Sequence, residues 1–242
     1  MIYFFIVLLF LLFLINYNYN ENFTINNNDI NFYVITLKNE ERIKNINLQK
    51  EILNTNINLI DGIKGNTINQ DQLLHNKILT TNFYFNNLKR NNEIGCYLSH
   101  LKIYDLIKQN INNTKYSVIF EDDFKIISKN ITYDLNLLIN NINNIDFDII
   151  FLGNTFDNVD FNNKITENIF KIDTNKNTIG TFAYLINNKN IDKLIELIKI
   201  IDSPIDVKLD NLIKNNFINA YVIYPNLVSY NHNLSSEIIT ND

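Results

Sequence analysis

From Asn31 onward, short apolar runs alternate with segments whose apolar residues recur at helical spacing, and this alternation constrains the fold more than any other feature. Between two such runs, apolar residues from Ile94 to Tyr104 keep the spacing of one helix face. Strands that alternate with helices predict an α/β domain, with a mostly parallel central sheet and helices on both faces. The predicted strands are 32–37, 57–62, 116–120, 147–153, 181–186 and 220–225.

The strand predicted at 116–120 runs directly into three acids, Glu121, Asp122 and Asp123. In sheets of this kind, ligands bind beyond the carboxyl ends of the strands. If the chain stays extended there, Glu121 and Asp123 point to one face and Asp122 points away. Two carboxylates on one face suit a hard divalent cation such as Mg²⁺ or Mn²⁺. A solvated surface turn would have the same spacing, so the spacing alone leaves both readings open.

The length and charge of the chain exclude some classes of protein. Its 242 residues are enough for one sizeable core. The net charge of −5 argues against a nucleic-acid partner, because proteins that bind nucleic acids usually present a basic face. Cys96 is the single cysteine, which excludes an internal disulfide, and we interpret it as a small buried hydrophobic residue.

The first fifteen residues, 1–15, are all apolar. This length lies between the core of a signal peptide and a full membrane span. No small-residue cleavage site follows, so we interpret residues 1–16 as an N-terminal hydrophobic helix that forms a membrane anchor or an uncleaved signal. A cleaved signal and a buried first element of the domain are the alternatives. Residues 17–30 are predicted to be an Asn-rich linker, and residues 31–240 the folded domain.

Several stretches resemble, in the same order, the sequence blocks of glycosyltransferase family 25. That family includes lipopolysaccharide galactosyl- and glucosyltransferases and the collagen galactosyltransferases. Together the stretches cover nearly all of residues 31–238. They are "FYVITLKNEERIKNI" (32–46), "EIGCYLSHLKIYDLI" (93–107), "VIFEDDF" (118–124), "GTFAYLINNKNIDKLI" (180–195), "SPIDVKL" (203–209) and "YPNLVSYNHNLSSEI" (224–238).

The resemblance implies a GT-A-like nucleotide-diphospho-sugar transferase fold, a UDP-sugar donor and inversion at the sugar carbon. It implies that Asp123, with Glu121, contacts Mn²⁺ or Mg²⁺ and the donor diphosphate, and Asp122 lies beside them. His232 is the candidate for a third metal ligand, because many enzymes of this fold use a histidine near the C-terminus.

An inverting transfer also needs a general base that takes the proton of the acceptor hydroxyl. Asp206, in the block that resembles the family's Pro-x-Asp, is the first candidate, and Asp210, one helical turn further on, is the second. Arg42, Glu93 and His100 are candidates for binding the donor. Structural alternatives stand beside them: Asp206 and Glu93 as first-turn helix acids, His100 as a core histidine and Arg42 as a solvated charge.

The predicted function is the metal-dependent transfer of a hexose, galactose or glucose, from UDP to a hydroxyl. The acceptor would be a glycan, a lipid-linked saccharide or hydroxylysine, and residues 1–16 would hold the enzyme at a membrane as a single-pass protein. The alternatives are a non-catalytic, membrane-anchored protein that binds nucleotide sugars or glycans, a metal-dependent phosphohydrolase, and a structural anchor. Turnover of a UDP-sugar with Mn²⁺ would separate the first function from the others.

Overall fold

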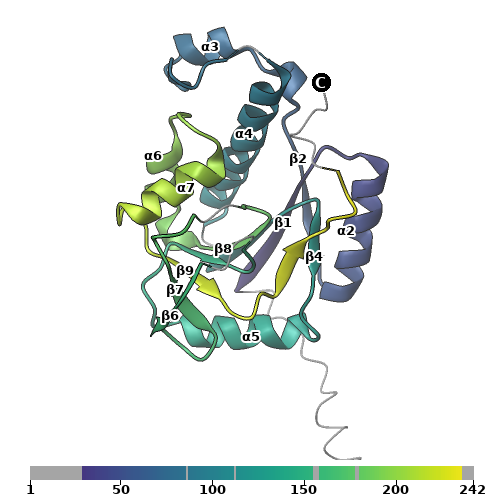
Figure 1. Cartoon of the computed structure of the whole chain (residues 1–242). Coiled ribbons are helices and arrows are strands. Elements are labelled where there is room, and N and C mark those ends of the chain that lie inside the picture. The colour runs from purple at the N-terminus through teal and green to yellow at the C-terminus, as the bar shows by residue number, and fades with distance from the viewer. Residues whose placement is uncertain (1–28, 86, 112, 155–157, 178–179, 236–242) are drawn as a thin grey trace, which may run out of the picture.

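The computed structural model describes residues 29–85, 87–111, 113–154, 158–177 and 180–235, which form a mixed α/β fold (Figure 1). The helices are α2 (Glu40–Leu53), α3 (Gln70–His75), α4 (Leu88–Gln109), α5 (Ile131–Ile142), α6 (Ile191–Ile198) and α7 (Ile205–Lys214). The strands are β1 (Ile30–Thr36), β2 (Asn58–Asp61), β3 (Tyr116–Glu121), β4 (Phe124–Ile126), β5 (Ile149–Phe151), β6 (Val159–Lys164), β7 (Ile169–Ile172), β8 (Ala183–Asn187), β9 (Ala220–Ile223) and β10 (Val228–Tyr230).

The large sheet has eight strands in the order β2-β1-β3-β8-β5-β9-β7-β6. β7 and β8 run antiparallel to their neighbours, and the other six strands share one direction. The prediction of a mostly parallel sheet is therefore confirmed, with two reversed strands that the sequence pattern did not reveal. The edge pair β6 and β7 was not predicted, because β6 is largely exposed and polar and β7 is only four residues long.

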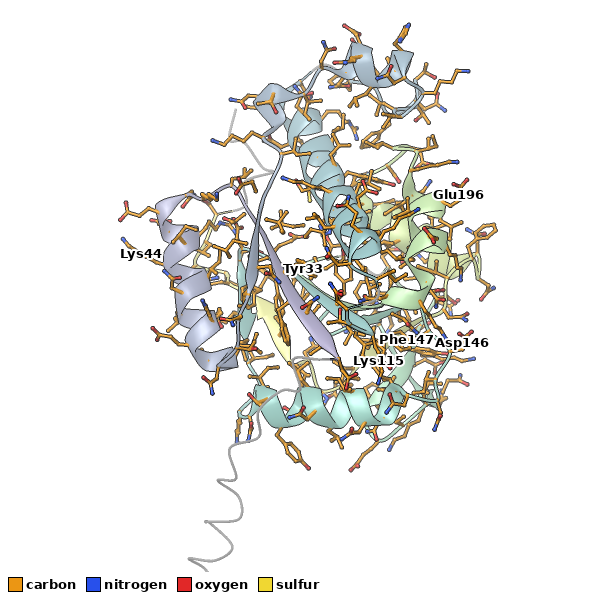
Figure 2. The ribbon with its side chains drawn as sticks, turned by 180° about the vertical axis from the view of Figure 1, so that it is seen from behind. Tyr33, Lys44, Lys115, Asp146, Phe147 and Glu196 are labelled. Carbon is orange, nitrogen blue, oxygen red and sulfur yellow. The ribbon has the colours of Figure 1, made fainter. Side chains whose placement is uncertain are left out.

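Helices cover both faces of this sheet, as predicted, and the side chains of β3 show how the two cores are divided. Val118 and Phe120 pack into a core shared with α2 and α5. Ile119 points to the opposite face and packs into a core shared with α4, α6 and α7. This alternation is the period of two that a strand buried on both faces requires. By contrast, Lys44 lies on the outer side of α2, away from the sheet (Figure 2).

Asparagine side chains start four of the helices, because each accepts hydrogen bonds from backbone amides of the first turn. They are Asn39 for α2, Asn69 for α3, Asn87 for α4 and Asn130 for α5. The helix that carries Glu93 therefore begins at Leu88, and Glu93 lies in its second turn rather than at its start.

A second, two-stranded sheet brings the C-terminal part of the chain beside the acidic turn, which is formed by Asp122 and Asp123 at the end of β3. β10 pairs antiparallel with β4, which follows directly after Asp123, and β4 lies beside the yellow C-terminal strand in Figure 1. Gly153 permits this close approach, because a Cβ atom there would lie 1.9 Å from the carbonyl oxygen of Val228. The amide of Leu227 donates to the carbonyl of Leu152 at 2.8 Å and holds the same crossing.

The predicted N-terminal hydrophobic helix, residues 1–16, lies outside the described residues, as do residues 17–28 of the predicted linker. Within the part of the chain that the structure describes, no helix is both long enough and apolar enough to cross a membrane.

Candidate active site

The three acids lie where three parallel strands end. β3 ends at Glu121, and Asp122 and Asp123 form the turn that leads into β4. They border a pocket together with the ends of β1 and β2 and one side of α4. The lining residues are Ile35, Thr36, Leu37, Arg42, Gly62, Ile63, Gly65, Asn92, Cys96, Ser99, Glu121, Asp122 and Asp123. The acids thus lie at the edge of the sheet where α/β folds bind ligands.

Arg42 forms a buried ion pair with two of these acids. Its Nη1 lies 2.9 Å from Asp122 Oδ1 and 3.1 Å from Asp123 Oδ2, and its Nη2 donates to the carbonyl of Ser235 at 2.6 Å. The side chain of Arg42 is only 4% exposed, so it is not the solvated charge considered from the sequence. Its contacts are to protein carboxylates and a carbonyl, so the guanidinium neutralises the acidic turn.

The orientation predicted for Asp122 is wrong. The extended-chain argument placed it on the face opposite to Asp123, but both carboxylates approach the same guanidinium nitrogen of Arg42. The physical reason is that β3 stops at Glu121, so the alternation of a strand does not continue into the turn. Asp122 is buried by this contact.

Asp123 keeps one carboxylate oxygen without a partner. Oδ1 is buried, and among the described residues it has no hydrogen-bond partner. Burial and the nearby charge of Glu121 raise the pKa of the Asp123 carboxyl, although Arg42 opposes the shift. A buried carboxylate oxygen without a donor is costly unless a cation or a donor group reaches it. This oxygen is therefore the atom of the turn best prepared to bind a ligand.

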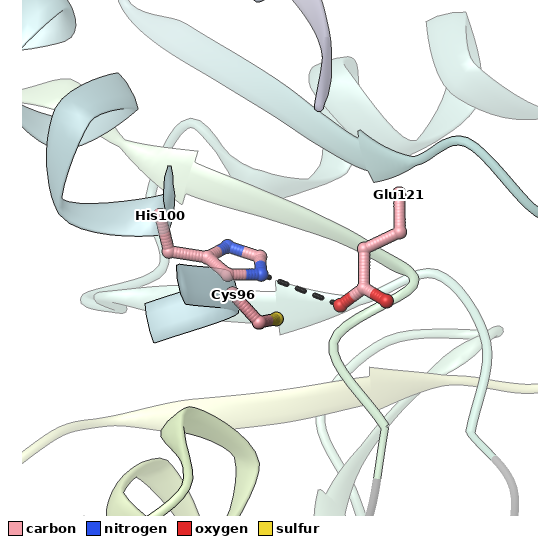
Figure 3. A group of neighbouring side chains, drawn as sticks. All are labelled: Cys96, His100 and Glu121. Carbon is pink, nitrogen blue, oxygen red and sulfur yellow. Dashed lines mark hydrogen bonds and ion pairs between the residues drawn. The ribbon is translucent and has the colours of Figure 1, made fainter. Parts of the chain in front are cut away.

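Glu121 is held by a network that reaches into the core. His100, fully buried on α4, places Nε2 3.3 Å from Glu121 Oε1 (Figure 3). Its Nδ1 lies 2.7 Å from the hydroxyl of Tyr184. The hydroxyl of Thr181 donates to the same Glu121 oxygen. Burial alone would raise the pKa of Glu121, but the contacts with His100, Thr181 and Arg42 outweigh it and lower the pKa. Glu121 is thus a fixed, ionised carboxylate.

Asp206 lies within electrostatic reach of this network, in the first turn of α7, where its Oδ1 accepts from the amide of Val207 at 2.8 Å. Burial raises the pKa of Asp206, the charge of Glu121 adds to the rise, and His100 opposes it. Asp210, one turn further along, is buried and forms an ion pair with Lys214 at 2.7 Å. Asp206 thus has an electrostatic link to Glu121 and His100, and Asp210 is paired with Lys214 on its own helix.

Glu93 and His232 have surroundings different from those of the central acids. Glu93 forms an ion pair with Arg90 at 2.8 Å on the same helix. His232 is exposed, and its ring lies against that of Tyr230 with 4.0 Å between centroids. The neighbouring Asn231 donates its amide to the carbonyl of Asp123 at 2.6 Å, which ties this segment to the acidic turn.

Comparison of the sequence with models of known protein families identifies the class to which this protein belongs. The model of glycosyltransferase family 25, described as LPS biosynthesis protein, matches residues 29–212. The chain belongs to glycosyltransferase family 25. It is therefore a glycosyltransferase, and the resemblance of the sequence blocks is confirmed.

Two solved structures resemble this glycosyltransferase at low identity. One is A197 from STIV, with a TM-score of 0.40, 8% identity, and coverage of 80% of this chain and 81% of that chain. The other is a glycosyltransferase involved in the glycosylation of the major capsid of PBCV-1, with a TM-score of 0.43, 8% identity, and coverage of 80% and 81%. Both scores are too low to carry an argument about this chain. No curated protein matches it.

The glycosyltransferase holds its acidic turn with polar side chains of α2 that sequence reasoning missed. The Nδ2 of Asn45 donates to the carbonyls of Asp122 and Phe124, both at 2.9 Å, and Oε1 of Gln49 accepts from the amide of Ile126 at 2.8 Å. With Arg42, these residues form a buried polar stripe on α2. Their spacing of three, four and seven residues was the available signal.

Two further contacts shape the pocket wall on α4. The hydroxyl of Ser99 accepts from the amide of Ile63 at 2.8 Å and donates to the carbonyl of Gly95 at 2.7 Å. A Cβ atom on Gly95 would lie 2.4 Å from the carbonyl oxygen of Ile63. The loop after β2 therefore packs directly on the helix backbone, which explains the pairing of a glycine and a serine in "GCYLS".

Proposed function

We propose that this enzyme is a metal-dependent, inverting hexosyltransferase of the GT-A type that moves galactose or glucose from UDP to a hydroxyl. The observation that carries the proposal is the buried, unpartnered Oδ1 of Asp123 in a pocket at the carboxyl ends of β1, β2 and β3. The acceptor would be a glycan, a lipid-linked saccharide or hydroxylysine. Residues 1–16 would attach the enzyme to a membrane as a single-pass anchor.

The residues of the acidic turn fit a hard divalent cation. Asp123 and Glu121 offer carboxylate oxygens, which Mn²⁺ and Mg²⁺ prefer, and the orphan oxygen of Asp123 would gain a partner. His232 lies next to Asn231, which is tied to Asp123, and it would complete the set. When bound, such an ion would offset the negative charge that develops on the leaving diphosphate.

The protein's own groups have separate tasks in this proposal. Arg42 keeps Asp122 and Asp123 together against their mutual repulsion, and it also lines the pocket in which the donor would bind. Asp206 takes the proton of the attacking acceptor hydroxyl, and its raised pKa makes it a stronger base than an ordinary aspartate. His100 fixes the position of Glu121, while Glu93 and Asp210 stabilise α4 and α7 through their ion pairs.

The test measures the release of UDP from UDP-galactose and UDP-glucose by the full-length chain in detergent, with Mn²⁺ and with a chelator. We expect release that the chelator abolishes, and a loss of at least about 100-fold in Asp123→Asn, because an interaction of this kind contributes several kcal/mol. Asp105→Asn is the matched control, because Asp105 is exposed on α4.

Circular dichroism of each variant shows whether it is folded. Full activity in a folded Asp123→Asn variant, or activity that the chelator leaves unchanged, would refute the metal role. The absence of UDP release with every donor and an added acceptor mixture would refute the choice of donor.

A further inference from the structure

A thiol, an imidazole and a carboxylate meet at the inner wall of the pocket. Cys96 and His100 lie one turn apart on the same face of α4, and Glu121 ends β3 opposite them (Figure 3). One ligand atom of each, the Sγ, a ring nitrogen and a carboxylate oxygen, lies within 4.8 Å of the other two. Asp123 and His232, the ligands expected with Glu121, are not members of this group.

We propose that Cys96, His100 and Glu121 form a binding site for a thiophilic divalent cation, and that Zn²⁺ fits it best. Zn²⁺ accepts sulfur, nitrogen and oxygen ligands together, whereas Mg²⁺ and Mn²⁺ favour oxygen alone. The residue spacing follows the same rule as known zinc-binding helices, in which residues four apart present two ligands on one face.

The distances agree with a tetrahedral ion. Two ligands that each lie about 2.0 Å from one tetrahedral zinc ion are separated by about 3.3 Å. The Nε2 of His100 and the Oε1 of Glu121 are 3.3 Å apart. A thiolate and an imidazole on such an ion are separated by about 3.6 Å. The Sγ of Cys96 lies within 4.8 Å of a ligand atom of each of the other two residues, so the thiolate would move closer when the ion binds.

The surroundings of the three residues favour a cation. The Nδ1 of His100 contacts the hydroxyl of Tyr184 at 2.7 Å. In the metal-bound form Nδ1 would donate to that hydroxyl, and Nε2, which contacts Glu121 in the free protein, would bind the metal in place of a proton. Cys96 and Glu121 both line the pocket, so an ion has a path from solvent. A fourth ligand position would face the same pocket and take water.

The negative charges around the thiol of Cys96 support the same conclusion. Burial raises the pKa of Cys96, and the negative charges of Glu121, Asp206 and the acidic turn raise it further. The same negative charges attract a divalent cation, which replaces the thiol proton as that proton passes to solvent.

Glu121 belongs to both this site and the proposed site for the donor's metal. Zn²⁺ bound to Cys96, His100 and Glu121 would withdraw the carboxylate and inhibit transfer. This consequence rests on the proposed function, but the binding of the ion does not.

Co²⁺, a spectroscopic substitute for Zn²⁺, tests the binding on the full-length chain. Because Cys96 is the single cysteine of the sequence, a thiolate-to-cobalt charge-transfer band reports this residue alone. We expect the band to saturate at one cobalt per chain and to vanish when Zn²⁺ is added. Cys96→Ser, which preserves the size of the side chain, should lose the band and weaken Zn²⁺ binding by at least about 100-fold. Asp105→Asn, the control on the exposed side of α4, should keep both.

Several results would overturn the site. The first is that the wild-type chain shows no band at saturating cobalt. The second is that the band saturates at one cobalt per two chains. The third is that a folded Cys96→Ser variant binds Zn²⁺ with unchanged affinity. A second arm measures UDP release with added Zn²⁺, which should inhibit the wild type and spare Cys96→Ser. If cobalt binds as expected and no UDP is released under any condition, the proposed function fails and the metal site stands.

Discussion

If the charge of Arg42 is buried in an ion pair with the acidic turn, its loss should lower the free energy of unfolding more than the loss of a solvated charge does. Replacing Arg42 by Met removes the guanidinium that lies 2.9 Å from Asp122 and 3.1 Å from Asp123. The Asp122 side chain is 10% exposed, so its charge would remain buried without the guanidinium that neutralises it. Removing one partner of such a pair costs about 3–5 kcal/mol of the free energy of unfolding.

The lower end of that range is the better expectation here. The side chain of Asp123 is 22% exposed, and the pKa of its carboxyl is already raised, so it can be solvated or take up a proton when Arg42 is lost. We therefore expect Arg42→Met to lower the free energy of unfolding by about 3 kcal/mol. Arg42→Lys keeps the charge without the fork of donors and should lose less.

Urea denaturation of the full-length chain, followed by circular dichroism and tyrosine fluorescence, measures this loss. Lys44→Met on the same helix is the matched control, because its ion pair with Glu40 has side chains 72% and 84% exposed. An exposed pair contributes about 0–1 kcal/mol. The double variant Arg42→Met with Asp122→Asn should be more stable than Arg42→Met alone, since the buried side chain at position 122 then carries no charge.

A loss for Arg42→Met no larger than that for Lys44→Met would refute the buried ion pair. A double variant less stable than the single one would refute the argument that the buried Asp122 charge causes the loss.

Two further predictions concern the pocket wall and the proposed base. Gly95→Ala should lower the free energy of unfolding by about 1–3 kcal/mol in the same urea assay, because the new Cβ would lie 2.4 Å from the carbonyl of Ile63. Gly62→Ala, whose nearest contact at 3.0 Å is the flexible end of a leucine, is its control and should cost less. Burial foremost, and then the charge of Glu121, raise the pKa of Asp206, and a base acts in its deprotonated form. The rate of hexose transfer should therefore fall with decreasing pH, at a pKa above that of an ordinary aspartate. Asp206→Asn should reduce transfer by about 100-fold or more, and a folded variant with the wild-type pH profile would exclude Asp206 as the base.

Local sequence patterns predicted the elements that bury many apolar residues. The runs that became β1, β3 and β8 were each recognised, because a strand buried on both faces is apolar along its whole length. The strands β6 and β7 and the direction of β8 were not predicted. β6 is largely polar and exposed, β7 has only four residues, and a local periodicity does not report the direction of a strand. The acids of the site could be placed at a strand end for the same reason that β3 itself could be predicted.

The sequence by itself determined the α/β class, the family blocks and the place of Glu121, Asp122 and Asp123 at the end of a strand. Only the tertiary structure decided what these acids contact. Arg42 reaches Asp122 across 80 positions of the chain, and His100 meets Glu121 from another helix. Contacts of this kind arise because α2 and α4 pack on opposite faces of the sheet. The apolar periodicity of a strand or a helix reports which of its sides is buried, and it carries no information about which distant residue lies there.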